Sequence, residues 1–432
     1  MFRKKIIILG AGLAGLSAAW HLQKRGIDCQ IFEKETEVGG LCRSKKINGF
    51  TFDYDGHLLH FKHRYTLDLV KELLGNNLVE HRRNSWIYAF GTYVHYPFQA
   101  NLYGLPPSII KECLIGFIQA QKNGHHRQKC KDFLSWVKRA FGSGIAKHFM
   151  IPYNTKFWTL PPKELTSEWL DGFIPVPSLP QLLEGTIEES NKEFGYNARF
   201  WYPKKGGIGS LPSAFAERIR NIHTGCAISE INLKNKEIKF SIGNGEKFDY
   251  LISTIPLPEI SNLIRSLPEE VRKSFKKLKW NSIFNLNLGV KEEDALGRHW
   301  IYFPHKEPCF FRAGFFNNFA SDLAPARHTS LYAEVSYSTG RTIDKGKIAS
   351  QIIKDLRKAG IVGEHSGILV RDINDIEYGY PICDKNYKLA RGKILGELAK
   401  HNIVSCGRYG SWRYMSMEET MLEGKTATDR FR

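Results

Sequence analysis

Two short apolar runs separated by a helix-like stretch open the chain. The first run is Ile6-Ile7-Ile8-Leu9, and the second ends at Glu33. Runs of this length with a helical pattern between them predict two strands joined by a helix. We therefore expect the chain to begin as a doubly wound α/β sheet.

The apolar pattern changes twice further along the chain. From Pro106 to about Ser190, apolar residues recur at helical spacing, which predicts an inserted helical unit. After Phe200, short β-rich runs separated by polar turns return and predict the rest of the first sheet and a mixed sheet. The expected strands lie at residues 228–231, 237–242, 250–254, 284–290, 330–337 and 403–407, and the expected helices at 108–121, 132–141, 345–359 and 418–431.

Three glycines follow the first apolar run in the pattern Gly10-x-Gly12-x-x-Gly15. In dinucleotide-binding folds, the first glycine permits a sharp turn, the second lets the backbone approach a pyrophosphate, and the third lets the helix pack close to the strand. The phosphates then lie at the helix N-terminus, where free N–H groups and the helix dipole favour anions. Glu33 would accept hydrogen bonds from ribose hydroxyls at the tip of the second strand. The segment therefore predicts a dinucleotide-binding site.

Composition and charge narrow the class of protein. The 432 residues are 42% hydrophobic and 25% charged, which are ordinary values for a folded globular chain. Lysine and arginine number 62 against 44 acidic residues, which gives a formal net charge of +18. The basic residues are spread along the chain without a nucleic-acid-binding motif, so we expect an anionic small-molecule substrate and no nucleic acid.

The cysteines and the hydropathy argue against a metal site and a membrane span. The eight cysteines form no CxxC pair and no Cys/His ligand spacing, so neither a disulfide framework nor a metal centre is expected. No apolar run approaches the roughly 20 residues that span a bilayer. No signal-like segment precedes the first strand. We therefore expect a cytoplasmic protein.

Several further segments resemble one group of enzymes. Glu33, Gly39-Gly40, Arg43 and the run Phe50–His57 resemble the start of the flavin amine oxidase and protoporphyrinogen oxidase superfamily. Within it, the chain is similar to the UDP-galactopyranose mutases of eukaryotic type, because matching segments follow in the family's order over most of the chain. These segments are Tyr96–Gln99, Tyr153–Trp158, Asn197–Gly207, Tyr302–Pro304, Phe310–Arg312, Gly379–Pro381 and Gly407–Tyr414.

The resemblance implies an α/β fold of three domains with FAD between them. One is an FAD-binding, Rossmann-like doubly wound sheet domain, the second is an inserted helical domain, and the third is a mixed-sheet substrate domain. The FAD-binding domain is expected at 1–80, 200–260 and 395–432, the helical domain at 100–195, and the substrate domain at 80–100 and 260–395.

The implied reaction interconverts UDP-galactopyranose and UDP-galactofuranose, or a related nucleotide sugar, through N5 of reduced FAD without net redox. The alternative is an FAD-dependent oxidoreductase of the amine oxidase or protoporphyrinogen oxidase type, in which hydride passes from another substrate to FAD. The mutases of this family associate variously, so assembly into a homo-oligomer stays open.

The resemblance also implies roles for individual residues. His57 is expected to be catalytic beside the flavin, where a side chain that titrates near neutrality can respond to flavin reduction. Arg312 is expected to hold the substrate diphosphate, since a guanidinium fork fits two phosphate oxygens as charge builds on departing UDP. The other expected substrate contacts are Tyr96, Gln99, Asn197, Tyr380 and Tyr414, and the expected flavin contacts are Gly10, Gly12, Gly15, Glu33, Gly39, Gly40, Arg43, Gly56, Gly407, Arg408 and Met421.

The chain departs from the family at one substrate position. A second diphosphate arginine is expected shortly after a Trp-Leu pair, but Phe173 follows Trp169-Leu170 here. A phenyl ring cannot neutralise a phosphate, so either Arg199 or another cation replaces that arginine, or the ligand is not a nucleotide diphosphate sugar. The segment Met417–Gly424 is also shorter than its counterpart in the eukaryotic mutases and looks more like the superfamily's general flavin-binding helix start.

Overall fold

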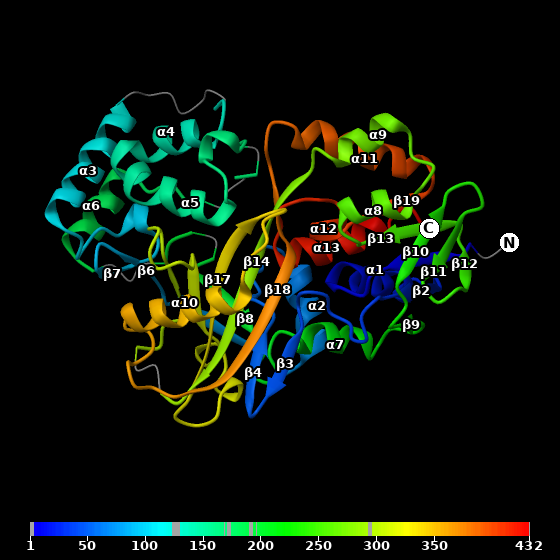
Figure 1. The fold of residues 1–432 in the computed structure, drawn as a ribbon, viewed down its shortest axis with the longest axis horizontal. Coiled ribbons are helices and arrows are strands. Elements are labelled where there is room, and N and C mark those ends of the chain that lie inside the picture. The colour runs from blue at the N-terminus through cyan, green and yellow to red at the C-terminus, as the bar shows by residue number, and fades with distance from the viewer. Residues whose placement is uncertain are drawn as a thin grey trace.

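The computed structural model describes residues 4–122, 130–167, 169–170, 174–189, 193–195, 197–292 and 296–431. Helices α3 to α6 gather at one end of the molecule, long strands run through the middle, and a parallel sheet with its helices forms the other end (Figure 1). Within the described residues, no helix is both long and apolar enough to cross a membrane.

A five-stranded parallel sheet holds the glycine motif. Its strand order is β19-β13-β1-β2-β9, and all four residues of β1 are buried, as in sheets covered on both faces. Helices α1 and α13 pack closely, because a Cβ at Gly424 would lie 2.4 Å from the carbonyl oxygen of Ala14. The expected doubly wound sheet is confirmed. Its elements are β1 (Ile6–Leu9), α1 (Leu13–Lys24), β2 (Cys29–Phe32), β9 (Ile222–His223), β13 (Tyr250–Ser253), β19 (Ile403–Ser405) and α13 (Met417–Ala427).

A seven-stranded mixed sheet has two faces of different character. Its order is β18-β14-β17-β16-β15-β6-β7. Phe284, Leu286 and Leu288 of β14 lie in a core with residues of α10 (Lys345–Lys358). The alternate residues Asn285 and Asn287 are also fully buried, on the opposite, polar face. The strands are β6 (Ser85–Ala89), β7 (Thr92–His95), β14 (Lys279–Val290), β15 (Trp300–Tyr302), β16 (Arg312–Phe315), β17 (Thr329–Ser338) and β18 (Ile368–Ile382).

The helical end is held together by an aromatic core and by glycines at a helix crossing. Phe117, Phe133 and Phe141 are fully buried in this core. A Cβ at Gly142 would lie 2.0 Å from the carbonyl oxygen of Gly116, so the two helices approach more closely than side chains would allow. The helices are α3 (Pro107–Lys122), α4 (Phe133–Ile145), α5 (Ile151–Trp158) and α6 (Leu179–Ile187).

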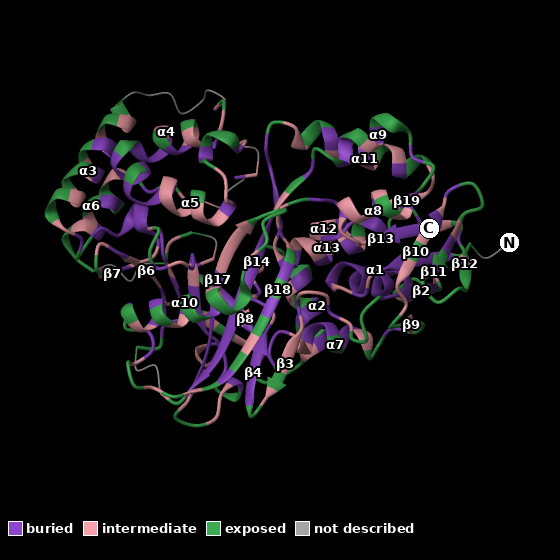
Figure 2. Cartoon of the chain, in the orientation of Figure 1, coloured by how far each residue is buried: buried purple, intermediate pink, exposed green. Residues whose placement is uncertain are grey.

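Smaller elements connect these parts. Exposed residues concentrate on the outer sides of the helices, whereas the strands are mostly buried (Figure 2). The remaining elements are β3 (Ser44–Ile47), β4 (Phe50–Asp53), α2 (Arg64–Leu74), β5 (Val79–Arg82), β8 (Arg199–Tyr202), α7 (Ser210–Ala216), β10 (Ile228–Asn232), β11 (Glu237–Phe240), β12 (Gly245–Lys247), α8 (Leu257–Leu263), α9 (Glu269–Phe275), α11 (Tyr387–Lys400) and α12 (Gly407–Gly410).

Candidate active site

The glycine turn between β1 and α1 leaves no room for side chains. Gly10 has φ +96°, and a Cβ there would lie 2.3 Å from Thr254 Oγ1. A Cβ at Gly15 would lie 2.0 Å from the carbonyl oxygen of Gly10. Gly12 faces Gly39 in an isolated parallel bridge, and no side chain caps the N-terminus of α1. The bare backbone and the uncapped helix start fit the pyrophosphate of a dinucleotide cofactor.

Glu33 holds the glycine turn through both carboxylate oxygens. Its Oε2 accepts a hydrogen bond from Ala11 N at 2.7 Å, and its Oε1 accepts one from Glu35 N at 3.0 Å. Each oxygen retains a lone pair, so these bonds leave acceptor capacity for ribose hydroxyls. Glu33 is thus a structural part of the turn as well as a candidate ribose ligand.

Other expected flavin contacts lie beside the glycine turn and the start of α1. Gly40 has φ +58°, and its carbonyl oxygen accepts a hydrogen bond from Arg43 Nε at 2.8 Å. At Gly407, with φ +80°, a Cβ would lie 2.6 Å from Ala14 Cβ, so this start of α12 can approach α1. Met421 lies in the core between α1 and α13.

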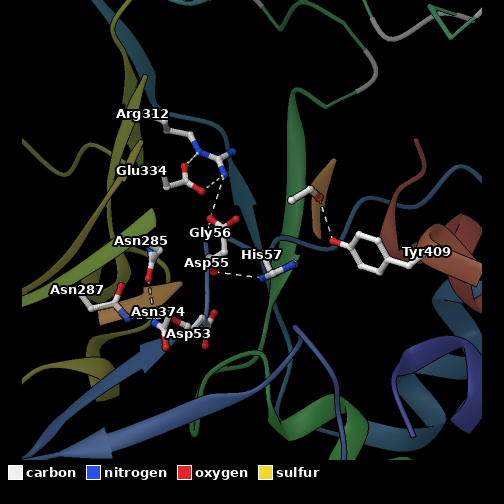
Figure 3. A network of polar contacts seen from close by, with 11 residues as sticks. Asp53, Asp55, Gly56, His57, Asn285, Asn287, Arg312, Glu334, Asn374 and Tyr409 are labelled. Atoms are coloured by element: carbon white, nitrogen blue, oxygen red, sulfur yellow. Dashed lines mark hydrogen bonds and ion pairs between the residues drawn. The ribbon is translucent and has the colours of Figure 1, made fainter. Parts of the chain in front are cut away.

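The histidine loop follows β4 and includes Asp55, Gly56 and His57 (Figure 3). Gly56 N donates to Asp55 Oδ1 at 2.6 Å, and His57 Nδ1 lies 3.2 Å from the carbonyl oxygen of Asp55. A Cβ at Gly56 would lie 2.2 Å from Tyr332 Oη, so a glycine is needed here for space. Burial lowers the pKa of His57 to about 4. The ring is therefore neutral at pH 7, and the expected titration near neutrality does not occur in this structure.

Arg312 is engaged by two carboxylates (Figure 3). Strands β16 and β17 place it directly opposite Glu334. Its Nη2 donates to Glu334 Oε1 at 2.8 Å and lies 3.3 Å from Asp55 Oδ1, and its Nε contacts Glu334 Oε2. The side chain of Glu334 is fully buried. The guanidinium fork is thus not free in this structure, and Nη1 is left for another acceptor.

Tyrosines from three remote segments form one side of an aromatic wall. The Tyr96 and Tyr302 ring centroids are 4.9 Å apart, and those of Tyr153 and Tyr302 are 5.5 Å apart. Burial raises the pKa of Tyr96 and of Tyr153 well above the ordinary phenol value. These hydroxyls therefore stay protonated and can donate hydrogen bonds at neutral pH.

A second group of rings continues the wall toward the C-terminal segment. Tyr380 lies 5.8 Å from Tyr414 and 4.8 Å from Phe157, measured between ring centroids. The Arg408 guanidinium carbon lies 5.4 Å from the centroid of Tyr380 and 5.9 Å from that of Tyr414. Its Nε and Nη2 also donate to the carbonyl oxygen of Met415. The structure thus places Tyr380 and Tyr414, both expected substrate contacts, beside Arg408, an expected flavin contact.

Two expected substrate contacts are occupied by protein groups. Gln99 is buried, and its Nε2 donates to the carbonyl oxygen of Pro175 at 3.0 Å. Asn197 accepts from Arg83 through its backbone oxygen at 3.1 Å and also through its side-chain oxygen. Both amides therefore help to fold the surrounding loops.

The structure also bears on the missing second arginine. Phe173 lies outside the described residues. Arg199 is half exposed and pairs with Glu193 at 2.9 Å and with Glu80 at 3.6 Å, so its guanidinium is engaged by protein carboxylates in this structure. Arg83, which the sequence interpretation missed, lies with its guanidinium carbon 4.6 Å from the Tyr96 ring centroid.

Several further residues at the site had no predicted role. Glu334 and Asp55 pair with Arg312. Tyr302 lies between Tyr96 and Tyr153, and Tyr153 joins the two groups of rings through Phe157, with ring centroids 6.1 Å apart. The spacing of Tyr153 and Phe157 by four residues places them on one helix face and could have indicated a shared wall. Glu334 carried no such signal, because its pairing depends on strand register. Among the described residues, no group of three or more His, Cys, Asp or Glu side chains could hold a metal ion.

Comparison with known proteins identifies the family. Residues 13–427 match the flavin-containing amine oxidoreductases. The chain belongs to this family. Membership implies a flavin cofactor, and the glycine turn fits one.

The individual proteins that resemble this chain are named as different types of enzyme. The crystal structure of reduced UDP-galactopyranose mutase is 29% identical, with a TM-score of 0.93 over 99% of this chain and 95% of that chain. The 4,4'-diaponeurosporene oxygenase of Staphylococcus aureus is 22% identical over 92% of this chain and 88% of its own length. Other curated relatives match over short stretches. The chain spans 53% of an uncharacterized protein from Methanothermococcus thermolithotrophicus and 10% of the zeta-carotene-forming phytoene desaturase of Myxococcus xanthus.

Proposed function

We propose that this protein is an FAD-dependent isomerase that interconverts UDP-galactopyranose and UDP-galactofuranose or a related nucleotide sugar. The observation that carries the proposal is the convergence of Tyr96, Tyr302, Tyr380, Tyr414 and Arg408 beside the histidine loop. These residues come from four remote segments. The likeness to reduced UDP-galactopyranose mutase over 99% of the chain supports the same reading.

The chain's own residues would bind and orient both ligands. The glycine turn and the start of α1 would hold the FAD pyrophosphate, with Glu33 toward the ribose. Bound reduced FAD would supply a nucleophilic nitrogen for attack on the sugar. Tyr96 offers a flat face for the uracil ring, and the protonated hydroxyls of Tyr380 and Tyr414 would donate to the diphosphate.

Arg312 would complete diphosphate binding through Nη1. Two carboxylates already neutralise its charge, so its contribution depends on the directed N–H bond more than on net charge. Preorganised donors of this kind stabilise charge as UDP departs. His57, neutral at pH 7, would act on the flavin side as a hydrogen-bond partner.

The decisive experiment measures isomerisation directly. The purified protein, reconstituted with FAD and reduced by dithionite under anaerobic conditions, is given UDP-galactofuranose, and the nucleotide sugars are separated by chromatography. Formation of UDP-galactopyranose only with reduced protein, without consumption of oxygen or NADPH, is expected. Absence of conversion together with no UDP-induced change in the flavin spectrum would reject the proposal.

An FAD-dependent oxidoreductase is the second candidate. The neutralisation of Arg312 by Glu334 and Asp55 supports it, because a subsite with one cation and two carboxylates is a poor anion receptor. The full-length similarity to the Staphylococcus aureus oxygenase supports it as well. This reading predicts that a substrate without UDP reduces the flavin, with stoichiometric consumption of an oxidant.

A further inference from the structure

A surface outside the candidate active site lies on α9 and α11, which run side by side (Figure 1). Lys393 Nζ of α11 is 3.8 Å from Glu270 Oε2 of α9. The inner sides of both helices share one core, to which Phe275, Ile394 and Leu398 contribute. Exposed residues mark their outer sides (Figure 2).

The outer sides carry a surplus of lysines. On these two fully described helices, the exposed acidic residues are Glu269 and Glu270, while Glu397 is mostly buried. The exposed lysines on the helices and beside their ends are Lys273, Lys276, Lys277, Lys385, Lys388, Lys393 and Lys400. We call this surface the basic face.

The basic face includes an apolar strip on α11. Leu389 is 67% exposed, and Gly392 and Gly396 lie on the same side of α11. A Cβ at either glycine would meet nothing within 4 Å, so packing does not require glycine there. Glycine inside a helix is destabilising relative to alanine, which makes two unneeded glycines on one exposed strip unexpected.

A cavity of about 820 Å³ opens beside α9. Phe275, Leu278 and Trp280 form part of its lining, and Arg272 and Lys276 lie among its polar residues. The buried Trp280 Nε1 has no hydrogen-bond partner among the described residues. Glu269 and Glu377 also line it, so the cavity combines apolar side chains with charges of both signs and an unused donor.

We propose that the basic face docks this protein onto an anionic lipid surface, with the cavity receiving part of one lipid. Lysines spread over two helices suit an extended layer of charged headgroups better than a single small anion. The exposed leucine and the apolar cavity favour lipid over nucleic acid, because phosphodiester backbones offer no apolar layer beneath the charge. This proposal is independent of the reaction that the active site catalyses.

The test is co-sedimentation of the full-length holoprotein with vesicles. Vesicles of phosphatidylcholine alone are compared with vesicles of equal parts phosphatidylcholine and phosphatidylglycerol, at low and high salt. The test variant is Lys273→Glu/Lys277→Glu/Lys388→Glu. The matched control, Lys46→Glu/Lys234→Glu/Lys236→Glu, carries the same charge change on exposed lysines elsewhere. Leu389→Gln tests the apolar contribution separately.

Binding is expected only to the anionic vesicles and is expected to fall at high salt. A lysine near an anionic surface contributes about fivefold to partitioning. Loss of three lysines alone weakens binding roughly 100-fold, and the three added carboxylates are repelled as well, so the test variant should bind at least roughly 100-fold more weakly. The control variant should retain most of its binding to the anionic vesicles. Leu389→Gln should bind these vesicles about fivefold more weakly. Equal binding to both vesicle types, or equal loss in the test and control variants, would overturn the proposal.

Duplex DNA of the same phosphate concentration serves as a competitor. Retention of DNA by the wild type but not by the test variant, with no vesicle binding, would assign the face to nucleic acid instead. If the test variant does not fold, the salt dependence of the wild type and the Leu389→Gln variant still decide between these outcomes.

Discussion

Lys156 provides the sharpest test of the structure, because its buried amino group meets three backbone acceptors. Its Nζ donates to the carbonyl oxygens of Phe303 at 3.1 Å, His305 at 2.8 Å and Pro308 at 2.5 Å. These bonds tie α5 to the loop that follows β15. Burial lowers the pKa of Lys156 from 10.5 to about 7.

The sign of the pH effect follows from this shift. The folded pKa lies below the unfolded value, so between pH 7 and 10.5 the unfolded chain binds a proton that the folded chain does not. Stability therefore rises with pH through this window, by up to about 1.4 kcal/mol per pH unit. Between pH 7 and 9 the wild type should gain about 2 kcal/mol from Lys156, and Lys156→Met should lose this gain.

The assay is urea denaturation of wild type and Lys156→Met at several pH values from 7 to 9. The difference between their free energies of unfolding isolates Lys156, because the other titrating groups are common to both. Cys309 and Asp355 both favour the charged ammonium, and both remain in the variant. Lys163→Met, at an exposed position, controls for the loss of one lysine. Parallel pH profiles for wild type and Lys156→Met would refute the reasoning.

Three further changes test other parts of the structure. Gly56→Ala should destabilise the fold by about 1 to 3 kcal/mol in thermal unfolding, because the new Cβ would lie 2.2 Å from Tyr332 Oη. Glu418→Ala should lower the free energy of unfolding by about 2 kcal/mol in the same urea titration, since its carboxylate accepts from the backbone N–H groups of residues 62 and 63 at the start of α2. Glu418→Gln should retain part of this stability, because its side-chain oxygen can still accept a hydrogen bond. Arg312→Ala should weaken UDP binding by about 1.5 to 3 kcal/mol in calorimetry, and an unchanged dissociation constant would remove Arg312 from the site.

Strands and helices whose apolar residues follow one clear repeat were predictable from the sequence. The expected strand at 250–254 corresponds to β13 (Tyr250–Ser253), and the expected helix at 345–359 corresponds to α10 (Lys345–Lys358). A buried parallel strand carries a continuous apolar run, and an amphipathic helix carries a regular one. Each pattern lies within one segment of the chain, so it can be recognised without knowledge of the fold.

Strand β14 shows where local patterns fail. The sequence predicted a strand at 284–290, but β14 begins at Lys279. Asn281, Asn285 and Asn287 are all fully buried on its polar face. Such residues normally indicate turns. Here they are partly partnered across the fold. Asn287 Nδ2 donates to the carbonyl oxygen of Asp53 at 3.0 Å, whereas Asn287 Oδ1 and Asn285 Nδ2 have no hydrogen-bond partner among the described residues. No local pattern contains that information.

The candidate site was predictable in part for the same reason. The glycine turn is one contiguous motif, and the ordered segments around Tyr96, Tyr380 and Tyr414 marked the aromatic wall. The surroundings of Arg312 could not be read in this way, because its partner Glu334 comes from another strand and its pairing depends on register. The environment of a charged group was thus the least predictable feature, although it decides what that group can bind.

The pairing of Arg312 with Glu334 also governs how its mutants should be interpreted. Removing the guanidinium leaves a fully buried carboxylate, and breaking a buried pair typically costs about 3 to 5 kcal/mol of stability. A loss of UDP binding in Arg312→Ala could then reflect local collapse. Glu334→Gln keeps the arginine and a side-chain acceptor but removes one of the two neutralising charges. If Arg312 contacts a diphosphate, this substitution should strengthen UDP binding, whereas a purely structural arginine would leave it unchanged or weaker.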